Sequence, residues 1–472
     1  MSGRPTPRRG KAAPAAGRKV RVGGGQGFWG DDLDAPPRLV EGGTIDYLVL
    51  DYLAEVTMSI LRKLHGRDPA SGYATDFVQL MERIWPTCVE RGIRVIANAG
   101  GVNASGCADG LIYAGRRAGM AGRVRIGLVA GDDLMDRLDE LLEAGHPLAN
   151  LDTGESLATV RDRVRSANAY LGAAPVVDAL RRGADVVVTG RVADPALTAA
   201  PLVHEFRWSM GDWDRMAAAV LAGHVVECGA QATGGNRMAE WWTIPDLDVV
   251  GFPVVEVEES GAFTVTKHPG TGGRVDRRSV TEQIVYEIGD PRRVTTPDVV
   301  ADFTTIRLTD EGHDRVRLEG IRGAPPTDSY KVSVAYAAGW TAAGTLLYTW
   351  PDAVEKASAA EAILHRRFRR LGYRFDAVHT ELVGWNAGHG PLSGPPPTDA
   401  PEVQLRIAVR SEHRDSVERF SREMAPLVLA GPPSVTGYAG GRARVQEVIA
   451  YWPALIAKRA VDPLVTVEVR AV

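Results

Sequence analysis

Residues 45–55 read Ile-Asp-Tyr-Leu-Val-Leu-Asp-Tyr-Leu-Ala-Glu, and this stretch carries the pattern on which the fold depends. Residues 45–50 are apolar enough for a buried strand of a parallel sheet. Asp51 and Glu55 then stand at the carboxyl end of that strand, the edge at which open α/β sheets bind ligands. They are interpreted either as an acid/base pair at a site, or as a helix N-cap followed by a solvated side chain. The sequence alone leaves the two interpretations even.

The same arrangement of an apolar strand and a polar, glycine-containing loop recurs along the first half of the chain. The expected strands are residues 20–22, 45–50, 94–97, 124–129 and 184–188. Residues 77–91 and 161–182 read as helices between strands, and such alternation is typical of a parallel sheet covered by helices. We therefore predict an α/β fold with a Rossmann-like parallel sheet in residues 20–244, in preference to a closed barrel. The loops after the strands are expected at one edge.

The pattern changes after Pro245. Residues 254–257 and 263–267 read as a hairpin, and further short strands with few helices follow. Residues 245–472 are therefore predicted to form a second, β-rich α+β domain. At the other end, residues 1–19 are rich in Arg, Lys, Pro, Ala and Gly, and a disordered basic tail is expected there.

Composition narrows the class of protein. The chain of 472 residues has a net charge of -4 and a pI near 6.2, which predicts no nucleic-acid partner. No apolar run reaches the roughly 18 residues of a transmembrane helix, and no secretory signal is recognised, so no membrane partner and a cytoplasmic location are predicted. Cys88, Cys107 and Cys228 lack CxxC spacing, which argues against a disulfide framework and a structural zinc site. A small-molecule partner is expected, and homo-oligomer formation is left open.

A second informative stretch, residues 223–236, reads Gly-His-Val-Val-Glu-Cys-Gly-Ala-Gln-Ala-Thr-Gly-Gly-Asn. It joins a predicted helix end to a polar glycine loop. His224, Glu227 and Cys228 are spaced so that an imidazole, a carboxylate and a thiol converge within one helical turn. Taken alone, His224 and Cys228 are more simply explained as buried core residues. The repetition of the same loop chemistry elsewhere favours a functional interpretation.

Glycine-rich loops supply the candidate binding residues. Without a Cβ, backbone N–H groups can turn towards one point and hold phosphate or carboxylate oxygens. The candidates are Gly24, Gly25, Asn98, Gly100, Gly101, Asn103, Thr189, Arg191, Asp194, Thr233, Gly234, Gly235, Asn236, Lys267 and Thr271. Residues 100–101 and 234–235 are expected to hold an oxyanion or a phosphate, and Lys267 places a cation beside the loop at residues 270–273. A plain turn remains the alternative for residues 23–30, which lack Walker-loop spacing.

A metal site is a further hypothesis. Asp51 and Glu55, with Asp132 after the fourth strand, supply the carboxylate oxygens that Mg²⁺ prefers. No cofactor is otherwise required by these patterns.

Several stretches form a distinctive set when they are taken together. They are residues 23–31 (Gly-Gly-Gly-Gln-Gly-Phe-Trp-Gly-Asp), 46–58, 98–103 (Asn-Ala-Gly-Gly-Val-Asn), 131–133 (Gly-Asp-Asp), 188–194 (Val-Thr-Gly-Arg-Val-Ala-Asp), 223–224, 227–236, 266–267 and 270–273. With these stretches the chain resembles the acyclic terpene utilisation (AtuA) family of bacterial proteins. Members of that family are associated with the breakdown of branched acyclic terpenoid acids, a route that runs through coenzyme A thioesters. The resemblance therefore implies an organic acid or an acyl-CoA as the small-molecule partner.

The leading interpretation is a cytoplasmic enzyme that acts on a branched organic acid or its acyl-CoA thioester by addition or elimination, as a hydratase or lyase. Such chemistry needs an acid or base beside a carbonyl and donors for an enolate oxygen. His224 or Glu227 is predicted as the proton shuttle. Asp51 and Glu55 are predicted as a second acid/base pair or as cation ligands, and Cys228 as a less favoured nucleophile. The alternatives are a nucleotide-dependent ligase or transferase, and a non-catalytic partner protein of acyl-CoA carboxylation.

Overall fold

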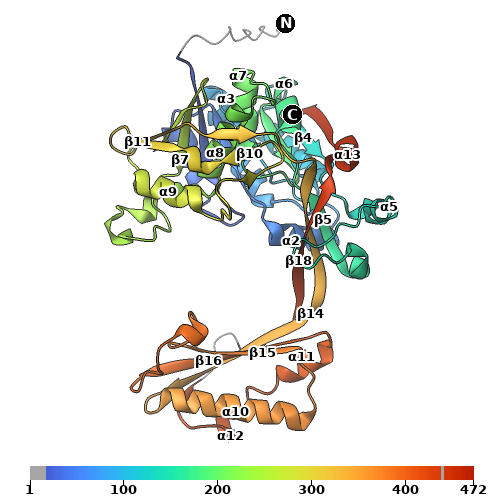
Figure 1. Cartoon of the computed structure of the whole chain (residues 1–472), viewed down its shortest axis with the longest axis vertical. Coiled ribbons are helices and arrows are strands. Elements are labelled where there is room, and N and C mark those ends of the chain that lie inside the picture. The colour runs from blue at the N-terminus through green and yellow to red at the C-terminus, as the bar shows by residue number, and fades with distance from the viewer. Residues whose placement is uncertain (1–16, 437–440) are drawn as a thin grey trace. The chain divides into compact units, whose positions relative to one another are not determined.

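The structure is a computed structural model of the chain and describes residues 17–436 and 441–472 (Figure 1). Most of the predicted tail, residues 1–16, lies outside the described residues, and Lys19 already begins a strand. The chain divides into two compact units. The first consists of the residues up to Arg161 together with Arg165–Ala335 and Tyr451–Val472, and the second of Asp162–Val164 and Tyr336–Ala450.

The first unit is built on a sheet whose centre is parallel. Its central strands are, in spatial order, β1 (Lys19–Gln26), β2 (Tyr47–Leu50), β3 (Arg94–Ala97), β6 (Val186–Thr189) and β4 (Arg125–Ala130). Each neighbouring pair is parallel, as the sequence predicts. Residues such as Leu48 on β2 and Val187 on β6 are fully buried, which fits strands covered on both faces.

Antiparallel strands extend this sheet on both sides. Next to β1 lie β7 (Pro253–Glu258), β8 (Phe263–Lys267), β12 (Val316–Glu319) and β11 (Arg307–Asp310), and next to β4 lies β19 (Thr466–Ala471). The fold is therefore α/β with a mixed sheet. A Rossmann-like layout is not confirmed, because that fold places its first strand in the middle of a parallel sheet, whereas β1 pairs with antiparallel β7. The predicted boundary between residues 244 and 245 is corrected for the same reason, since β7 and β8 continue the sheet that β1 belongs to.

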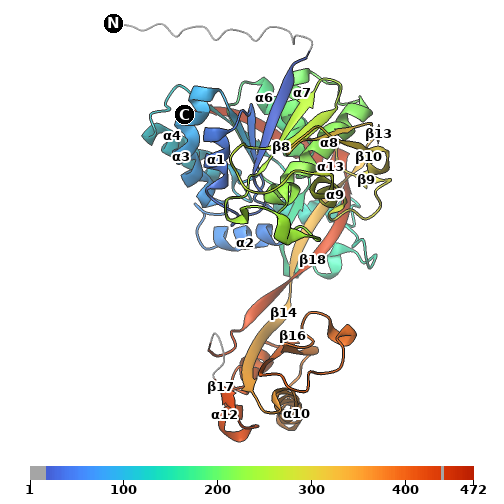
Figure 2. The same ribbon diagram turned by 90° about the vertical axis from the view of Figure 1, so that its left-hand side faces the viewer.

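Two groups of helices pack against this sheet. One contains α1 (Ala35–Gly42), α3 (Thr75–Arg91) and α4 (Ala104–Arg117), and the other α6 (Ala174–Arg181), α7 (Ala196–Phe206) and α8 (Trp213–Glu227). Figure 2 shows α1, α3 and α4 side by side. The unit also contains α2 (Glu55–His65), α5 (Leu138–Glu143), α9 (Arg277–Val285), α13 (Lys458–Val461) and a small sheet of β13 (Arg322–Ala324), β10 (Val300–Asp302) and β9 (Val294–Thr295). Because α8 packs on β1 and β7, its last turn reaches the end of the parallel strands.

Close packing against both faces of β1 explains two glycines of this strand, Gly24 against α8 and Gly25 against β2. A Cβ on Gly24 would lie 2.5 Å from the carbonyl oxygen of Val226, and a Cβ on Gly25 would lie 2.8 Å from a methyl group of Leu48. Both glycines lie within β1, and neither is in a loop. The prediction of an anion-binding loop at Gly24 and Gly25 is therefore corrected: glycine here permits a close approach of backbone and side chains.

Replacing Gly24 by alanine should destabilise the protein by about 1–3 kcal/mol, because the added methyl group overpacks the contact with α8. The free energy of unfolding in urea measures this effect. Gly289→Ala is the matched control, since a Cβ at Gly289 meets nothing within 4 Å. Equal stability of the two variants would contradict the close-packing explanation.

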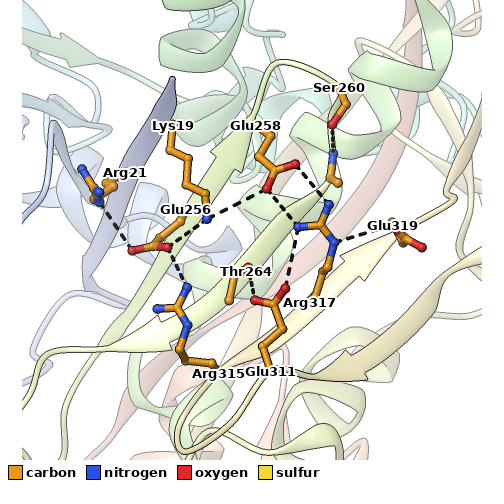
Figure 3. Close-up of polar contacts among 11 residues, drawn as sticks. Lys19, Arg21, Glu256, Glu258, Ser260, Thr264, Glu311, Arg315, Arg317 and Glu319 are labelled. Atoms are coloured by element: carbon orange, nitrogen blue, oxygen red, sulfur yellow. Dashed lines mark hydrogen bonds and ion pairs between the residues drawn. The ribbon is translucent and has the colours of Figure 1, made fainter. Parts of the chain in front are cut away.

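Charged side chains form a ladder across the antiparallel extension of the sheet (Figure 3). Glu256 on β7 accepts hydrogen bonds from Arg315 at 2.8 Å and from Arg21 at 3.4 Å. Glu258, two residues further on the same face, accepts from Arg317 at 2.9 and 3.1 Å. Charged side chains at every second position of a strand, as at Glu256 and Glu258, are typical of an antiparallel sheet that turns one face to water.

The second unit, taken by itself, is α+β. Its sheet contains β15 (Ala377–Val383), β16 (Glu402–Ser411), β17 (Val435–Thr436) and the part of β14 (Ser329–Thr349) from Tyr336 onwards. β18 (Gln446–Ala457) and β5 (Val164–Ala169) also pair with β14. The helices α10 (Ala353–Leu371) and α11 (Arg414–Phe420) pack on β16, and α12 (Leu427–Ala430) follows them (Figure 1). Their apolar side chains, Leu364 and Phe420 among them, share one core with Leu405 of the sheet. The predicted α+β character thus belongs to residues 336–450, a shorter segment than residues 245–472.

Candidate functional site

A cleft of about 540 Å³ lies in the first unit. Six of its lining residues are predicted site residues: Asp51, Glu55, Arg191, Asp194, Glu227 and Cys228. Asp51 directly follows β2, Arg191 comes just after β6, and Glu227 ends α8. The loops after β2 and β6 therefore lie at the carboxyl edge of these strands, as the sequence predicts. Among the described residues, none from the loops after β3 and β4 lines the cleft, although the sequence predicts those loops there as well.

Asp51 is buried, with 7% of its surface exposed. Nδ2 of Asn98 donates to Oδ1 of Asp51 at 2.6 Å, and the backbone N–H of Leu53 donates to the same oxygen at 3.2 Å. Burial raises the pKa of Asp51 well above its ordinary value, and the Asp194 carboxylate raises it further, against the opposing effect of Arg191. This environment favours the protonated acid. Asn98 thus holds Asp51 in place from behind the cleft wall.

Glu55 has the opposite environment. Its Oε1 accepts a hydrogen bond from the Tyr170 hydroxyl at 2.6 Å and another from Nζ of Lys331 at 3.2 Å. Burial alone would raise the pKa of Glu55, but the Tyr170 hydrogen bond, with Lys331 and Arg191 nearby, lowers that pKa to about 2. Glu55 is therefore a carboxylate at neutral pH, whereas Asp51, four residues earlier, favours its proton.

Arg191 is 2% exposed and lies against the Tyr170 ring, with Cζ 4.1 Å from the ring centroid. Its Nη1 donates to the Asp194 carboxylate and, at 3.1 Å, to the carbonyl of Val192. Nζ of Lys331 lies 4.8 Å from the same ring centroid. Two cations thus contact Tyr170, an arrangement that stabilises each of them through the π face of the ring.

Glu227 and His224 form a buried pair at the end of α8. Nδ1 of His224 lies 2.6 Å from Oε1 of Glu227, and Nε2 of His224 lies 3.2 Å from the carbonyl oxygen of Ile284, so Nε2 is the donor there. Burial alone would lower the pKa of His224, but the Glu227 carboxylate raises it above its ordinary value. Burial also raises the pKa of Glu227, against the opposing effect of His224. Glu227 lines the cleft, and His224 lies behind it.

Cys228 lines the cleft as a thiol. Burial, with the Glu227 carboxylate beside it, raises the pKa of Cys228 to about 12. Because the thiolate is the nucleophilic form, this environment argues against Cys228 as a nucleophile at neutral pH.

Several residues that were predicted to bind an oxyanion instead form hydrogen bonds or close packing contacts within the protein. The N–H of Gly100 donates to the carbonyl of Thr189 at 3.0 Å, and the hydroxyl of Thr189 donates to its neighbour's carbonyl at 2.8 Å. Gly101 has a left-handed φ of 53°, and a Cβ there would lie 2.4 Å from a side chain of α2. Asn103 caps α4 by accepting a hydrogen bond from a backbone N–H of that helix. The prediction that these four residues bind an oxyanion is therefore corrected. Gly100, Thr189 and Asn103 form hydrogen bonds within the protein, and Gly101 is a glycine because of its left-handed φ and close packing.

The turn after α8 is corrected in the same way. The N–H groups of Gly234 and Gly235 donate to backbone carbonyls within the turn, at 3.3 and 2.9 Å. The buried hydroxyl of Thr233 donates to the backbone carbonyl of Gly251, just before β7, at 2.6 Å. Nδ2 of Asn236 donates to the side chain of Gln231 at 3.0 Å. An oxyanion would therefore find the two glycine N–H groups already occupied.

Lys267 does not offer a free charge to an anion. Its Nζ forms an ion pair with Asp314 at 3.0 Å and donates to the carbonyl of Thr271 at 2.8 Å, and its side chain is only 6% exposed. Neither Lys267 nor Thr271 lines the cleft. The predicted anion site at this loop is corrected accordingly.

The comparison with known proteins supports the resemblance. The family described as "Acyclic terpene utilisation family protein AtuA" matches residues 20–467, nearly the whole chain. The chain belongs to this family. No curated protein and no solved structure matches it. Among the described residues of this AtuA-family chain, no helix combines the length and the apolar character needed to cross a membrane.

The three carboxylates of the Mg²⁺ hypothesis are not gathered at one point in the AtuA-family chain. Oδ2 of Asp132 accepts hydrogen bonds from the backbone N–H of Arg191 at 2.8 Å and from Nδ2 of Asn168 at 2.9 Å. Asp132 therefore lies behind Arg191, and the cleft is lined by Asp51 and Glu55 without it. Within residues 17–436 and 441–472, no group of three or more His, Cys, Asp or Glu side chains is arranged to hold a metal ion. The donor set does not fit a carboxylate-bound Mg²⁺.

Because of Asp132, the free energy of unfolding should fall as the pH rises from about 4 to about 7. Burial raises its pKa from the ordinary 3.8 to about 7, so in this interval the unfolded chain loses the proton and the folded chain keeps it. For one such group the free energy of unfolding falls by about 1.4 kcal/mol per pH unit. Asp132→Asn imitates the protonated acid and should flatten this decline, which urea unfolding across the interval measures. An unchanged pH dependence in the variant would contradict the assignment.

Other lining residues of the AtuA-family cleft were not predicted. They are Gly27, Phe28, Leu53, Ala54, Tyr170, Gln231, Tyr286, Glu287 and Lys331. Tyr170 directly follows β5, in a segment whose sequence predicts a helix, and its backbone N–H donates to the carbonyl of Lys331 at 2.9 Å. That contact joins segments far apart in the sequence, so no local pattern signals it. The Tyr286-Glu287 pair, just after α9, also lacks a distinctive motif.

Proposed function

We propose that this chain is a cytoplasmic enzyme of acyclic terpene utilisation that acts on a branched organic acid or its coenzyme A thioester by addition or elimination, as a hydratase or lyase. Family membership supports the role in acyclic terpene utilisation. The reaction class rests on the cleft, whose groups suit the movement of protons beside a carbonyl.

One observation carries the reaction class: carboxyl groups of opposite protonation preference line the same cleft. The environment of Asp51 favours the acid, and that of Glu55 favours the carboxylate. Glu227 adds a third carboxyl group, which pairs with Nδ1 of His224 at 2.6 Å. Titratable groups whose pKa values are pushed apart are the usual arrangement for an acid and a base in one mechanism.

The proton balance of an elimination assigns roles to Glu227, with its partner His224, and to Asp51. Glu227 accepts the proton from the carbon next to the substrate carbonyl. His224 stabilises the negative charge of the Glu227 carboxylate, which this proton neutralises. Asp51 donates its proton to the departing hydroxyl group, which leaves as water. Addition of water runs through the same steps in reverse, so each residue then takes the opposite role.

The alternatives differ in what they require of the glycine loops. A nucleotide-dependent ligase needs backbone N–H groups free to hold phosphates. The N–H groups of Gly100, Gly234 and Gly235 instead donate to carbonyls of the chain. This arrangement weighs against a phosphate cradle in these loops.

The experiment is a turnover assay with the purified chain and a branched 2-enoyl-CoA, the matching 3-hydroxyacyl-CoA and both free acids. Gain or loss of one water, followed by mass spectrometry, is the expected result. A lack of turnover and of carbon-bound hydrogen exchange in D₂O with all four compounds would overturn the proposal. Nucleotide hydrolysis that depends on the acid would then indicate the ligase, and binding to an acyl-CoA carboxylase would indicate a non-catalytic partner.

A further inference from the structure

We propose that the cleft admits the acyl end of its ligand only in an uncharged form, so that an ester, thioester or amide carbonyl binds and a free carboxylate is excluded. The inference rests on the proposed function for the statement that an acyl group enters this cleft. It goes further by choosing between the organic acid and its ester-type derivative.

The charges that line the cleft are mostly negative. Five lining residues carry carboxyl groups: Asp51, whose environment favours the neutral acid, and Glu55, Asp194, Glu227 and Glu287. Among the described residues that line it, the basic side chains are those of Arg191 and Lys331. An entering carboxylate would therefore meet more groups of its own sign than of the opposite sign.

Both cations are already engaged by carboxylates of the protein. Arg191 donates to Asp194 and has almost no exposed surface. Lys331 forms an ion pair with Glu55 at 3.2 Å, and both side chains are partly exposed. A ligand carboxylate would have to displace one of these partners, which would leave a protein carboxylate in the cleft without its counter-charge.

The other carboxyl groups offer no compensation. Asp51 is held by Asn98 in a buried position, and Oε1 of Glu227 faces His224. Oε2 of Glu227 is buried and has no hydrogen-bond partner among the described residues. Glu287 adds a further acidic group at the cleft wall. The protein thus provides a balanced or slightly negative site, which suits a neutral ligand.

A neutral carbonyl has modest needs that this cleft meets. It requires a hydrogen-bond donor for its oxygen, and the acid form of Asp51 is one. A carboxylate, by contrast, has to be desolvated beside groups of like charge. At a separation of about 6 Å, that repulsion weakens binding by about tenfold or more.

Three probes that share one branched acyl group test the proposal: 3-methylbutanoate, 3-methylbutanamide, and the N-acetylcysteamine thioester of the same acid. Dissociation constants are measured by ligand-observed NMR on the full chain at neutral pH. We expect the amide and the thioester to bind about tenfold or more tightly than the carboxylate.

A charge-removing variant sharpens this test. Glu55→Gln keeps an acceptor for the Tyr170 hydroxyl, removes a negative charge and leaves Lys331 without its carboxylate partner. Binding of 3-methylbutanoate should then improve several-fold, with little change for the amide. Glu319→Gln is the matched control: its side chain is exposed to a similar degree, at 40% against 37% for Glu55, and it pairs with Arg307 outside the cleft.

Equal or tighter binding of 3-methylbutanoate to the unmodified chain would overturn the proposal, as would binding of none of the three probes. Because the readout is affinity, it is independent of turnover. A chain that prefers the neutral probes and catalyses no hydration or elimination would refute the proposed reaction and support the charge selectivity.

Discussion

Replacing Asp51 by asparagine should lower kcat for the branched acyl substrate by about 10²–10⁴-fold, the contribution typical of a general acid or base. The amide has the shape of the acid and can still accept the hydrogen bond from Asn98, but it has no proton to donate to a leaving hydroxyl. The free energy of unfolding should not fall, because a neutral amide replaces a buried ionisable group. Steady-state kinetics and urea unfolding on the same preparation measure the two quantities.

Asp298→Asn is the matched control for this prediction. Asp298 is also a buried carboxyl group whose pKa is raised by burial, to about 6, but it accepts from the backbone N–H of Ala173 and does not line the cleft. The same chemical change there should leave kcat within about twofold. Full turnover in Asp51→Asn would remove Asp51 from the mechanism and leave Glu227 as the acid/base candidate.

Local sequence patterns predict the centre of the fold because each parallel strand is a short apolar run followed by polar residues. All of β1, β2, β3, β4 and β6 are recognisable in this way. The extension of the sheet is not recognisable, because β7 pairs with β1 across more than half of the first unit's sequence. The change in pattern after Pro245 is real, but it marks a change from parallel to antiparallel strands within one sheet. Such long-range pairing leaves no local signal.

The site was predictable where strand ends carry acidic residues and unpredictable where the chain supplies residues from afar. Asp51 follows β2 directly and Glu55 begins α2, so the edge rule for parallel sheets places both near the cleft. Glycine loops mislead because a glycine needed for close packing, such as Gly24, looks the same in sequence as one that holds an anion. Lys331 reaches the cleft from β14, and only the folded sheet brings it to Tyr170.

Replacing Glu227 by glutamine should likewise lower kcat by about 10²–10⁴-fold, because the amide accepts no proton from carbon. His224 differs, since it touches Glu227 and the carbonyl of Ile284 and does not line the cleft. In the proposed mechanism it is therefore a positioning residue that acts through Glu227. His224→Asn should keep the fold, since the amide replaces one ring nitrogen as a hydrogen-bond partner, and should lower kcat less than Glu227→Gln.

The pH profile separates this role from a purely structural one. The contact with His224 lowers the pKa of Glu227, so removal of the imidazole should move the acidic limb of the kcat profile to higher pH. Adding His224→Asn to Glu227→Gln should cost little further activity, since one residue acts through the other. A structural histidine predicts instead a free energy of unfolding lower by about 1–3 kcal/mol, with the turnover and pH profile of the folded protein intact. That result would make the end of α8 part of the core and move the chemistry to Asp51 and Glu55.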